Sequence, residues 1–441
     1  MEKGNTSSWI ESAFSDLAGS LNGAATGAAQ SVRKKALEIF KKHGLPQPGD
    51  EAWKYTVREG FLSEGFKFVS APESEVSKAE IEKYLPDGVQ HLVVFCNGKF
   101  SGEFSQINAL PDGVSIRPLE EVLSDPSSPD ASFILEQVSD EKLYDQAPLA
   151  ALNSAFLYTG LFMRIAGGVT FDVPLYILSL TTASQSNLFC PQFICAAEKG
   201  SKATIVEISA GTAKEKYFTN SVSRYFIDQE ASIDNYRIQL ESEEAICYSA
   251  LYADQKRESN FRTHAFNFGA KIARNEIYPV LNGKHSEATL NGLNLVAAEQ
   301  HIDNYTVIDH AVPECESHEL YKGIYGGKAR GVFSGTIIVR PDAQKTNAYQ
   351  SNKSILLSDK AASYSRPQLK IWADDVRCSH GATCGMLDRD ALFYIKSRGV
   401  PDNKAREMLL HAFASEVIAG VRIEPLRQYL EEQFENKIQK A

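Results

Sequence analysis

Cysteine, net positive charge and long apolar runs are all lacking in this sequence, and each shortage excludes a class of protein. Seven cysteines in 441 residues are too few for a disulfide scaffold. Acidic residues outnumber basic ones by 56 to 46, and the net charge of −10 argues against a protein that mainly binds nucleic acid. The most apolar stretch, residues 162–183, contains Arg164 and Asp172, which a membrane span would not tolerate. Residues 1–21 lack the apolar core of a signal peptide, so we expect a cytoplasmic protein with reduced thiols and neither membrane nor nucleic acid as partner.

Common catalytic motifs are missing as well. The segment Gly323–Ala329 resembles a phosphate-binding P-loop, but Lys322 stands where the first glycine belongs and Ala329 where serine or threonine is needed. His318 and Glu319 begin a zinc-protease motif that Lys322 leaves without its second histidine. The chain is therefore not expected to hydrolyse ATP itself.

Composition divides the chain into three regions. Residues 1–165 are helical and mixed, residues 166–385 are rich in short β-type runs, and residues 386–441 are again helical. The central pattern predicts a mainly β protein and suits a solenoid, but it shows no strict short repeat. Periodicity alone therefore leaves a β-helix, a large barrel and two sandwiches open.

Local signals are clearest near the two ends of the chain. Residues 91–100 predict a hairpin, because Asn97-Gly98 suits a tight turn. Asp402 is expected to cap a helix through Ala419, and Pro425 to lie in the first turn of a last helix. The buried stripe of the helix that begins at Asp402 is predicted to comprise Ala405, Met408, Leu409, Ala412, Phe413 and Val417.

One group of potential metal ligands lies in the β-rich region. Imidazole, thiolate and carboxylate groups all bind transition metals. Because alternate residues of a strand face opposite ways, the group need not converge, and we favour a structural role for it. Its members are His301, Asp303, Asp309, His310, Cys315 and His318.

A second group lies at the end of the β-rich region, in residues 374–385. In an extended segment, Cys378 and His380 would share one face, with Cα atoms about 6–7 Å apart. Two ligands do not close a four-coordinate metal site, so further ligands would have to come from elsewhere, for example from a partner chain. Cys384 could add a thiol or serve as a small buried apolar residue. Spacing alone favours an ordinary loop between domains.

These same residues carry a family resemblance. Residues 366–399 resemble the signature of the SufB/SufD family of iron–sulfur cluster assembly proteins, and the run Cys378–Thr383 is most like the SufD branch, because SufB typically has glutamate at the position of Gly381. The resemblance extends over about residues 45–420. Shorter matches are Trp53–Thr56, Val296–Ser317, Tyr321–Gly323, Gly331–Gly335 and Ala343–Thr346.

The resemblance implies a fold, partners and a site. The fold would be a right-handed parallel β-helix between helical ends. The chain would be a non-enzymatic scaffold that pairs with a SufB-like subunit and binds a SufC-like ABC ATPase through its C-terminal helices. It would hold no cofactor alone, and an iron–sulfur cluster would reside transiently on the complex. His380 would take part in cluster assembly and bind metal jointly with the partner. Cys378 would lie beside it, in a role that the resemblance defines less well. Cys384 stands where the family often has an apolar residue.

Two other functions stay open from the sequence. The chain could be a SufB-like paralogue that holds the cluster directly, although Gly381 and Trp53–Thr56 argue against this. It could also be a β-helix enzyme that acts on polysaccharides, which would require a converging pair of carboxylates that the sequence does not locate.

Overall fold

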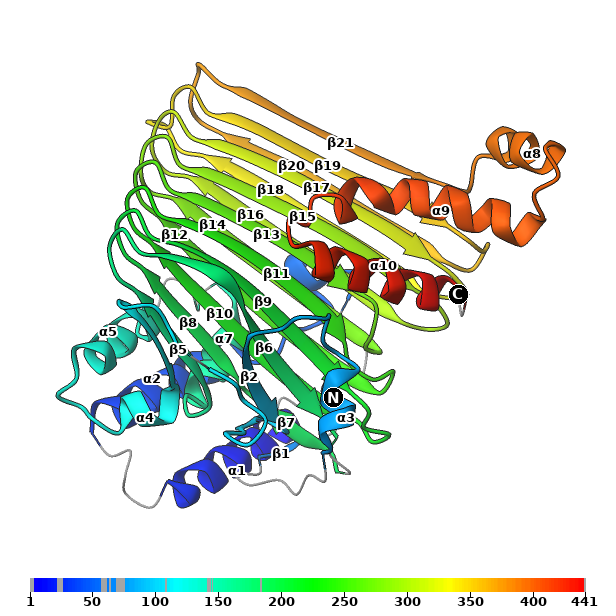
Figure 1. Ribbon diagram of the computed structural model, residues 1–441. Coiled ribbons are helices and arrows are strands. Elements are labelled where there is room, and N and C mark those ends of the chain that lie inside the picture. The colour runs from blue at the N-terminus through cyan, green and yellow to red at the C-terminus, as the bar shows by residue number, and fades with distance from the viewer. Residues whose placement is uncertain are drawn as a thin grey trace.

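From residue 192 onward, successive strands of the chain alternate between two facing sheets, which together form a parallel β-solenoid (Figure 1). The computed structural model describes residues 4–21, 27–56, 62, 65–68, 76–107, 109–140, 144, 146–182 and 185–439. Neighbouring strands in each sheet are parallel, except for the pairs β2 (His91–Cys96) with β3 (Lys99–Phe100) and β4 (Val114–Pro118) with β5 (Gly160–Ile165). This arrangement confirms the mainly β, parallel β-helix prediction and excludes the barrel and the paired sandwiches.

The two sheets contain the following strands. Sheet A comprises β4 (Val114–Pro118), β5 (Gly160–Ile165), β8 (Gln192–Ala197), β10 (Tyr217–Ile227), β12 (Ala245–Gln255), β14 (Ile272–Leu281), β16 (His301–His310), β18 (Arg330–Val339) and β20 (Ala362–Ile371), with β1 (Lys67–Phe68) and β7 (Asn187–Phe189) beside them. Sheet B comprises β2 (His91–Cys96), β3 (Lys99–Phe100), β6 (Thr170–Thr181), β9 (Lys202–Gly211), β11 (Ser232–Leu240), β13 (Asn260–Asn267), β15 (Glu287–Val296), β17 (Glu316–Tyr325), β19 (Asn347–Leu356) and β21 (Arg377–Gly385). The antiparallel pair β2–β3 is the hairpin expected for residues 91–100.

The repeating unit of the solenoid is a pair of strands, one from each sheet. In sheet B, Ser232 lies opposite Asn260, whereas Glu316 lies opposite Asn347, so the repeat varies by several residues from coil to coil. Variable turns between long strands explain why no strict hexapeptide or nonapeptide repeat is visible in the sequence. Inside the solenoid, apolar side chains such as Ile205, Leu251 and Leu290 form the largest core cluster.

The N-terminal helices cover the outer face of sheet A, except α3 (Lys78–Glu82), whose Ile81 shares a core cluster with outward-facing residues of sheet B. They are α1 (Gly4–Ser20), α2 (Ala28–His43), the 3-10 turn η1 (Glu51–Trp53), α3, α4 (Leu119–Leu123), α5 (Pro129–Val138) and α7 (Pro148–Ala155). Phe40 of α2 and Leu152 of α7 share a core cluster with Phe218 and Tyr248, which point outward from sheet A. The N-terminal region is therefore continuous with the solenoid through a buried apolar layer.

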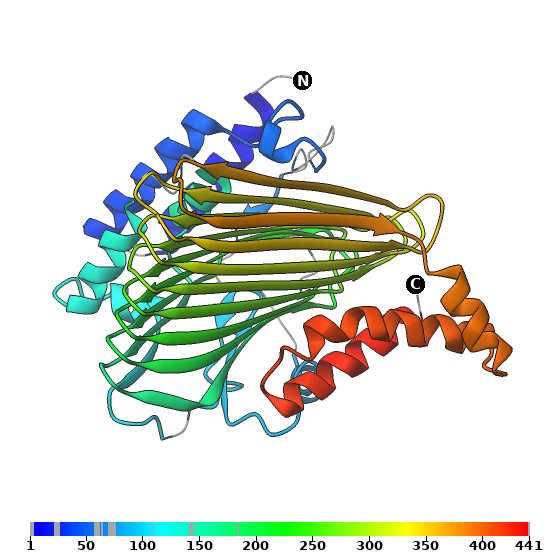
Figure 2. The ribbon, with the colours of Figure 1, turned by 90° about the horizontal axis from the view of Figure 1, so that it is seen from above.

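Three C-terminal helices lie on the opposite side of the solenoid. The last two pack against the outer face of sheet B, whereas the first packs on the helix that follows it (Figure 2). They are α8 (Arg389–Ser397), α9 (Asp402–Ile418) and α10 (Glu424–Ile438), and Pro425 lies in the first turn of α10 as predicted. None of the helices in the described ranges is both long and apolar enough to cross a membrane.

Two details predicted for α9 need correction, although Ala405 and Val417 of the predicted stripe are buried as expected. Pro401 is its N-cap residue, whereas Asp402 is already helical and pairs with Lys396 (2.6 Å) and Arg406 (2.7 Å). The buried side chains also differ from the predicted stripe, because α9 contacts sheet B, α8 and α10 on different sides, and Met408 is 53% exposed. The buried residues are Ala405, Leu410, Ala414, Val417 and Ile418.

A buried lysine fixes α9 to the solenoid. Lys322 of β17 is 4% exposed, and its Nζ donates to the carbonyl oxygen of Phe413 (2.7 Å) and pairs with Glu416 (2.5 Å). The same glutamate lies 3.6 Å from Nζ of Lys353 on β19. Glu416 thus joins α9 to two neighbouring strands, and its bond to Lys322 lowers the pKa of its carboxyl group.

Replacing Lys322 by methionine is expected to loosen α9 while keeping the apolar stem packed. The loss of a buried charged hydrogen bond should cost about 1.5–3 kcal/mol of docking free energy. Hydrogen exchange should therefore accelerate in α9 and α10 more than in the central strands. Lys353→Met is the matched control, because this half-exposed lysine makes a longer ion pair and should cost less than about 1 kcal/mol. Unchanged exchange in Lys322→Met would show that the lysine does not hold the helix.

Candidate functional site at the open end of the solenoid

The last coil of the solenoid is formed by β20 and β21, which end the two sheets (Figure 1). β21 pairs with β19 on one side and has no strand on its other side among the described residues. Large apolar side chains are exposed next to this edge: Trp372 is 59% exposed and Met386 is 56% exposed. An exposed strand edge with apolar neighbours is a ready docking surface for another chain.

The second group of potential ligands lies on β21, so residues 377–385 are a strand and not the loop that spacing alone favoured. Cys378, His380 and Cys384 alternate along the strand and therefore share one face. Their partners in β19 are Ala348, Gln350 and Ser354, all of which are buried inside the solenoid. The two thiols and the imidazole therefore face the interior at its open end.

The three groups differ in their surroundings. Cys378 is partly buried against Ala348 and other residues of a small apolar cluster, and burial raises the pKa of its thiol. His380 is exposed and has no hydrogen-bond partner among the described residues. Cys384 is exposed and lies close enough to Tyr325 to add to the raised pKa of that phenol, which burial mainly causes.

Chemically, this face offers soft and borderline donors without a complete metal site. Thiolate sulfur and imidazole nitrogen are the donors that bind iron in proteins. Within the part of the chain that the structure describes, no group of three or more histidine, cysteine, aspartate or glutamate residues is placed to hold a metal ion. A cluster at this face would need further ligands from outside the chain.

The first group of potential ligands does not converge. His301 and Asp303 face outward from sheet A and contact the N-terminal element: the Nε2 atom of His301 lies 3.1 Å from the hydroxyl of Thr56, which also bonds to Asp303. Asp303 further pairs with the buried Arg274. These two residues anchor residues 51–56 to the solenoid.

The other members of that group lie on different faces. His310 points inward, where its Nε2 atom meets the hydroxyl of Ser317 (2.9 Å), and burial lowers its pKa to about 4. Cys315 is buried in a turn near the carbonyl oxygen of Gly283 (3.3 Å). The side chain of His318 is 56% exposed, and Asp309 pairs with Arg340 (2.6 Å).

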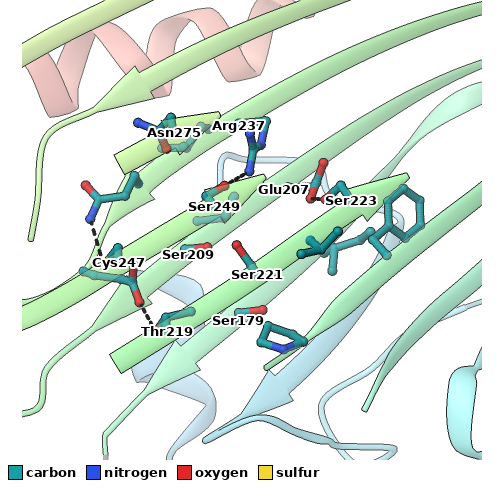
Figure 3. Close-up of a pocket in the computed structure, with 18 of the residues that line it drawn as sticks. Ser179, Glu207, Ser209, Thr219, Ser221, Ser223, Arg237, Cys247, Ser249 and Asn275 are labelled. Carbon is teal, nitrogen blue, oxygen red and sulfur yellow. Dashed lines mark hydrogen bonds between the residues drawn. The ribbon is translucent and has the colours of Figure 1, made fainter. Parts of the chain in front are cut away.

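Sequence reasoning missed a polar cavity inside the solenoid (Figure 3). Its volume is about 70 Å³, enough for several water molecules. Serine and threonine hydroxyl groups from facing strands contribute to this lining. The available signal in the sequence was the alternation of Thr219, Ser221 and Ser223, where a solenoid interior would normally be apolar. The labelled lining residues are Ser179, Glu207, Ser209, Thr219, Ser221, Ser223, Arg237, Cys247, Ser249 and Asn275.

The charged and nucleophilic groups of this cavity are engaged with one another. Glu207 accepts hydrogen bonds from Ser223 (2.6 Å), Tyr225 (2.7 Å) and Asn235 (2.8 Å). The thiol of Cys247 donates to Glu241 (2.6 Å), and burial, with the neighbouring Glu241, raises the pKa of Cys247 well above its ordinary value. Cys247 therefore keeps its proton and is a poor nucleophile.

The chain matches two family models, which together cover most of its length. A family model described as "SUF system FeS cluster assembly, SufBD core domain" matches residues 180–413, and one described as "SufBD protein N-terminal region" matches residues 7–177. An iron–sulfur cluster assembly SufBD family protein of Synechocystis is 29% identical over 407 residues, covering 90% of this chain and 88% of the relative. The iron–sulfur cluster assembly protein SufD of Escherichia coli is 27% identical, with 89% of each chain covered. SufD of Bacillus subtilis is 26% identical over 67% of this chain and 68% of its own.

Proposed function

Because this chain belongs to the SufBD family of iron–sulfur cluster assembly proteins, we propose that it is a SufD-like scaffold subunit of the SUF machinery. The observation that carries this proposal is the placement of Cys378, His380 and Cys384 on one face of an unpaired edge strand. A second chain can add ligands to donors that lie at an open edge, but it could not reach donors buried inside the solenoid. The chain itself catalyses no reaction in this proposal, and the cluster is its cargo.

The proposed first partner is a SufB-like subunit that docks at β20 and β21. Backbone groups at the edge of β21 can pair with a strand of the partner, and Trp372 and Met386 offer apolar area that docking would remove from water. The partner would supply the ligands that this chain lacks, and His380 would hold iron jointly with it. Cys378 would lie beside the assembling cluster, and Cys384 is available as an additional thiol.

The proposed second partner is a SufC-like ABC ATPase that binds the C-terminal helices. No residue of α8 is buried, and Phe393 and Tyr394 on it are 74% and 58% exposed. Together with the exposed Met408 of α9, they form an apolar surface of the kind that binds another protein. A separate ATPase agrees with the incomplete P-loop motif at Gly323–Ala329.

The cell compartment and the cargo belong to the same proposal. All seven cysteines are free thiols, which agrees with the reducing cytoplasm. We propose that the chain holds no cofactor alone and carries an iron–sulfur cluster only transiently, within the complex. Family membership leaves the polysaccharide-active interpretation without support.

The test is to purify the tagged full-length chain with its partners and to count iron and acid-labile sulfide on the complex. His380→Ala should leave the complex assembled but lower both contents about tenfold or more, because a donor to the metal is lost. Ser379→Ala is the matched control, since Ser379 lies on the opposite face of the same strand and should leave the contents unchanged.

Three outcomes would contradict parts of the proposal. Full iron and sulfide on the His380→Ala complex would remove His380 from cluster assembly. A stable cluster on the isolated chain would favour a SufB-like subunit that holds the cluster directly. Failure to recover a SufB-like or an ATPase partner would reject the corresponding docking surface.

A further inference from the structure

Three polar side chains form an inward-facing row beneath the open end of the solenoid. Glu319 of β17 lies opposite Gln350 of β19, and Gln350 lies opposite His380 of β21. Neighbouring strands are about 4.8 Å apart, so each side chain is within reach of the next. Glu319 and Gln350 are buried, whereas His380 is exposed because no further coil covers it.

The side-chain amide of Gln350 is held in place from two directions. Its Nε2 atom donates to Oε2 of Glu319 (2.6 Å). The amide also reaches toward Gly335 of sheet A, where a Cβ atom would lie 2.2 Å from Nε2. Glycine at position 335 therefore makes room for the amide, and the bond to Glu319 fixes which end of it is the carbonyl oxygen.

That arrangement leaves a buried acceptor without a protein partner next to an exposed ring that makes no hydrogen bond to the described residues. Oε1 of Gln350 is buried and has no hydrogen-bond partner among the described residues. The ring of His380 likewise has none. Buried acceptors are normally satisfied, and a change of rotamer of the exposed His380 could bring an N–H group to this oxygen.

We propose that Gln350 is a positioning residue for His380, with its Oε1 atom accepting a hydrogen bond from one ring nitrogen of the histidine. A fixed acceptor on one nitrogen selects the tautomer and turns the other nitrogen toward the open face. Glu319 acts one step further away by holding the amide. The benefit for metal binding rests on the proposed function, but the hydrogen bond itself does not.

The bond can be tested by ¹⁵N NMR of the full-length chain labelled at histidine, at a pH where the ring is neutral. In the natural protein, one tautomer of His380 should dominate, so its two ring nitrogens should have widely separated shifts. In Gln350→Met, which keeps the length but removes the acceptor, the two shifts should move toward each other as the tautomers mix. Glu319→Leu should produce a smaller change in the same direction.

Tyr349→Phe is the matched control, because Tyr349 precedes Gln350 but faces outward and is 47% exposed. It should leave the His380 spectrum unchanged. Circular dichroism of each variant checks that the solenoid is folded. An identical tautomer distribution in the natural protein and folded Gln350→Met would overturn the proposal.

A second measurement separates this inference from the proposed function. If His380 binds the cluster, the complex with Gln350→Met should load iron and sulfide several-fold more slowly than the natural complex. Unaltered loading by His380→Ala, together with a tautomer change in Gln350→Met, would reject the metal role and keep the hydrogen bond. Normal loading and an unchanged tautomer in Gln350→Met would reject the positioning role alone.

Discussion

Replacing Arg274 by methionine is expected to lower the free energy of unfolding by about 3–5 kcal/mol. The side chain of Arg274 is 2% exposed and pairs with Asp303 and with Glu276 (2.8 Å). Burial alone would lower the pKa of Arg274, but these two carboxylates raise it above its ordinary value, so the guanidinium stays charged. Without it, two carboxylates would be left in a buried site without their counter-charge.

The same change should release residues 51–56 from the outer face of sheet A. Arg274 donates to the carbonyl oxygen of Ala52 (2.9 Å), and its guanidinium lies 3.9 Å from the ring centroid of Trp53. On the other side it lies 4.7 Å from the ring centroid of Tyr305. Hydrogen exchange in residues 45–56 should therefore rise more than the global loss of stability accounts for.

Urea unfolding followed by circular dichroism measures the first effect, and Arg340→Met is its matched control. Arg340 pairs with Asp309 (2.6 Å), but its side chain is 53% exposed, so its loss should cost less than about 1 kcal/mol. If both variants lose the same free energy of unfolding, burial does not determine how much the ion pairs of Arg274 contribute to stability.

The second large effect concerns the buried carboxyl group of Glu319 and its dependence on pH. Burial raises the pKa of Glu319 from 4.5 to about 7, and Thr306 and Gln350 offset part of this rise. Well below pH 4.5 the carboxyl group is protonated in both the folded and the unfolded chain. As the pH rises further, the unfolded chain releases the proton and the folded chain retains it, so stability falls until the folded carboxyl also ionises. A difference of about 2.5 pKa units corresponds to about 3 kcal/mol.

Glu319→Gln should remove this dependence. Glutamine can still accept a hydrogen bond from Gln350 through its carbonyl oxygen, and it has no carboxyl group to ionise. Compared with the natural protein, the variant should therefore gain about 3 kcal/mol of relative stability between pH 5 and pH 8. Urea unfolding of both proteins at intervals of one pH unit measures the difference. His310 also titrates on unfolding, but it is present in both proteins, so its effect cancels in the difference between their stabilities. A stability difference that stays constant with pH would contradict the assignment to Glu319.

Local sequence signals predicted local structure well. The turn at Asn97-Gly98 produced its hairpin, and Pro425 marked the start of α10, because both effects depend on the backbone of a few adjacent residues. The buried side of α9 was predicted only in part, because burial there depends on distant elements and not on adjacent residues. Apolar side chains occur on several of its sides, and which of them are covered depends on sheet B and two other helices.

The sequence by itself determined the family and the identity of the candidate donors, because the long run around Cys378 and His380 is specific without any knowledge of the fold. The tertiary structure decided what surrounds those donors. Coil-by-coil register placed Gln350 beside His380 and Glu319 beside Gln350, and each of these neighbours is about thirty positions away in sequence. It also placed Trp53 against Arg274 and left β21 without a further strand on its outer side in the described chain. Such contacts arise from the stacking of coils of unequal length, and no periodicity within a single segment encodes them.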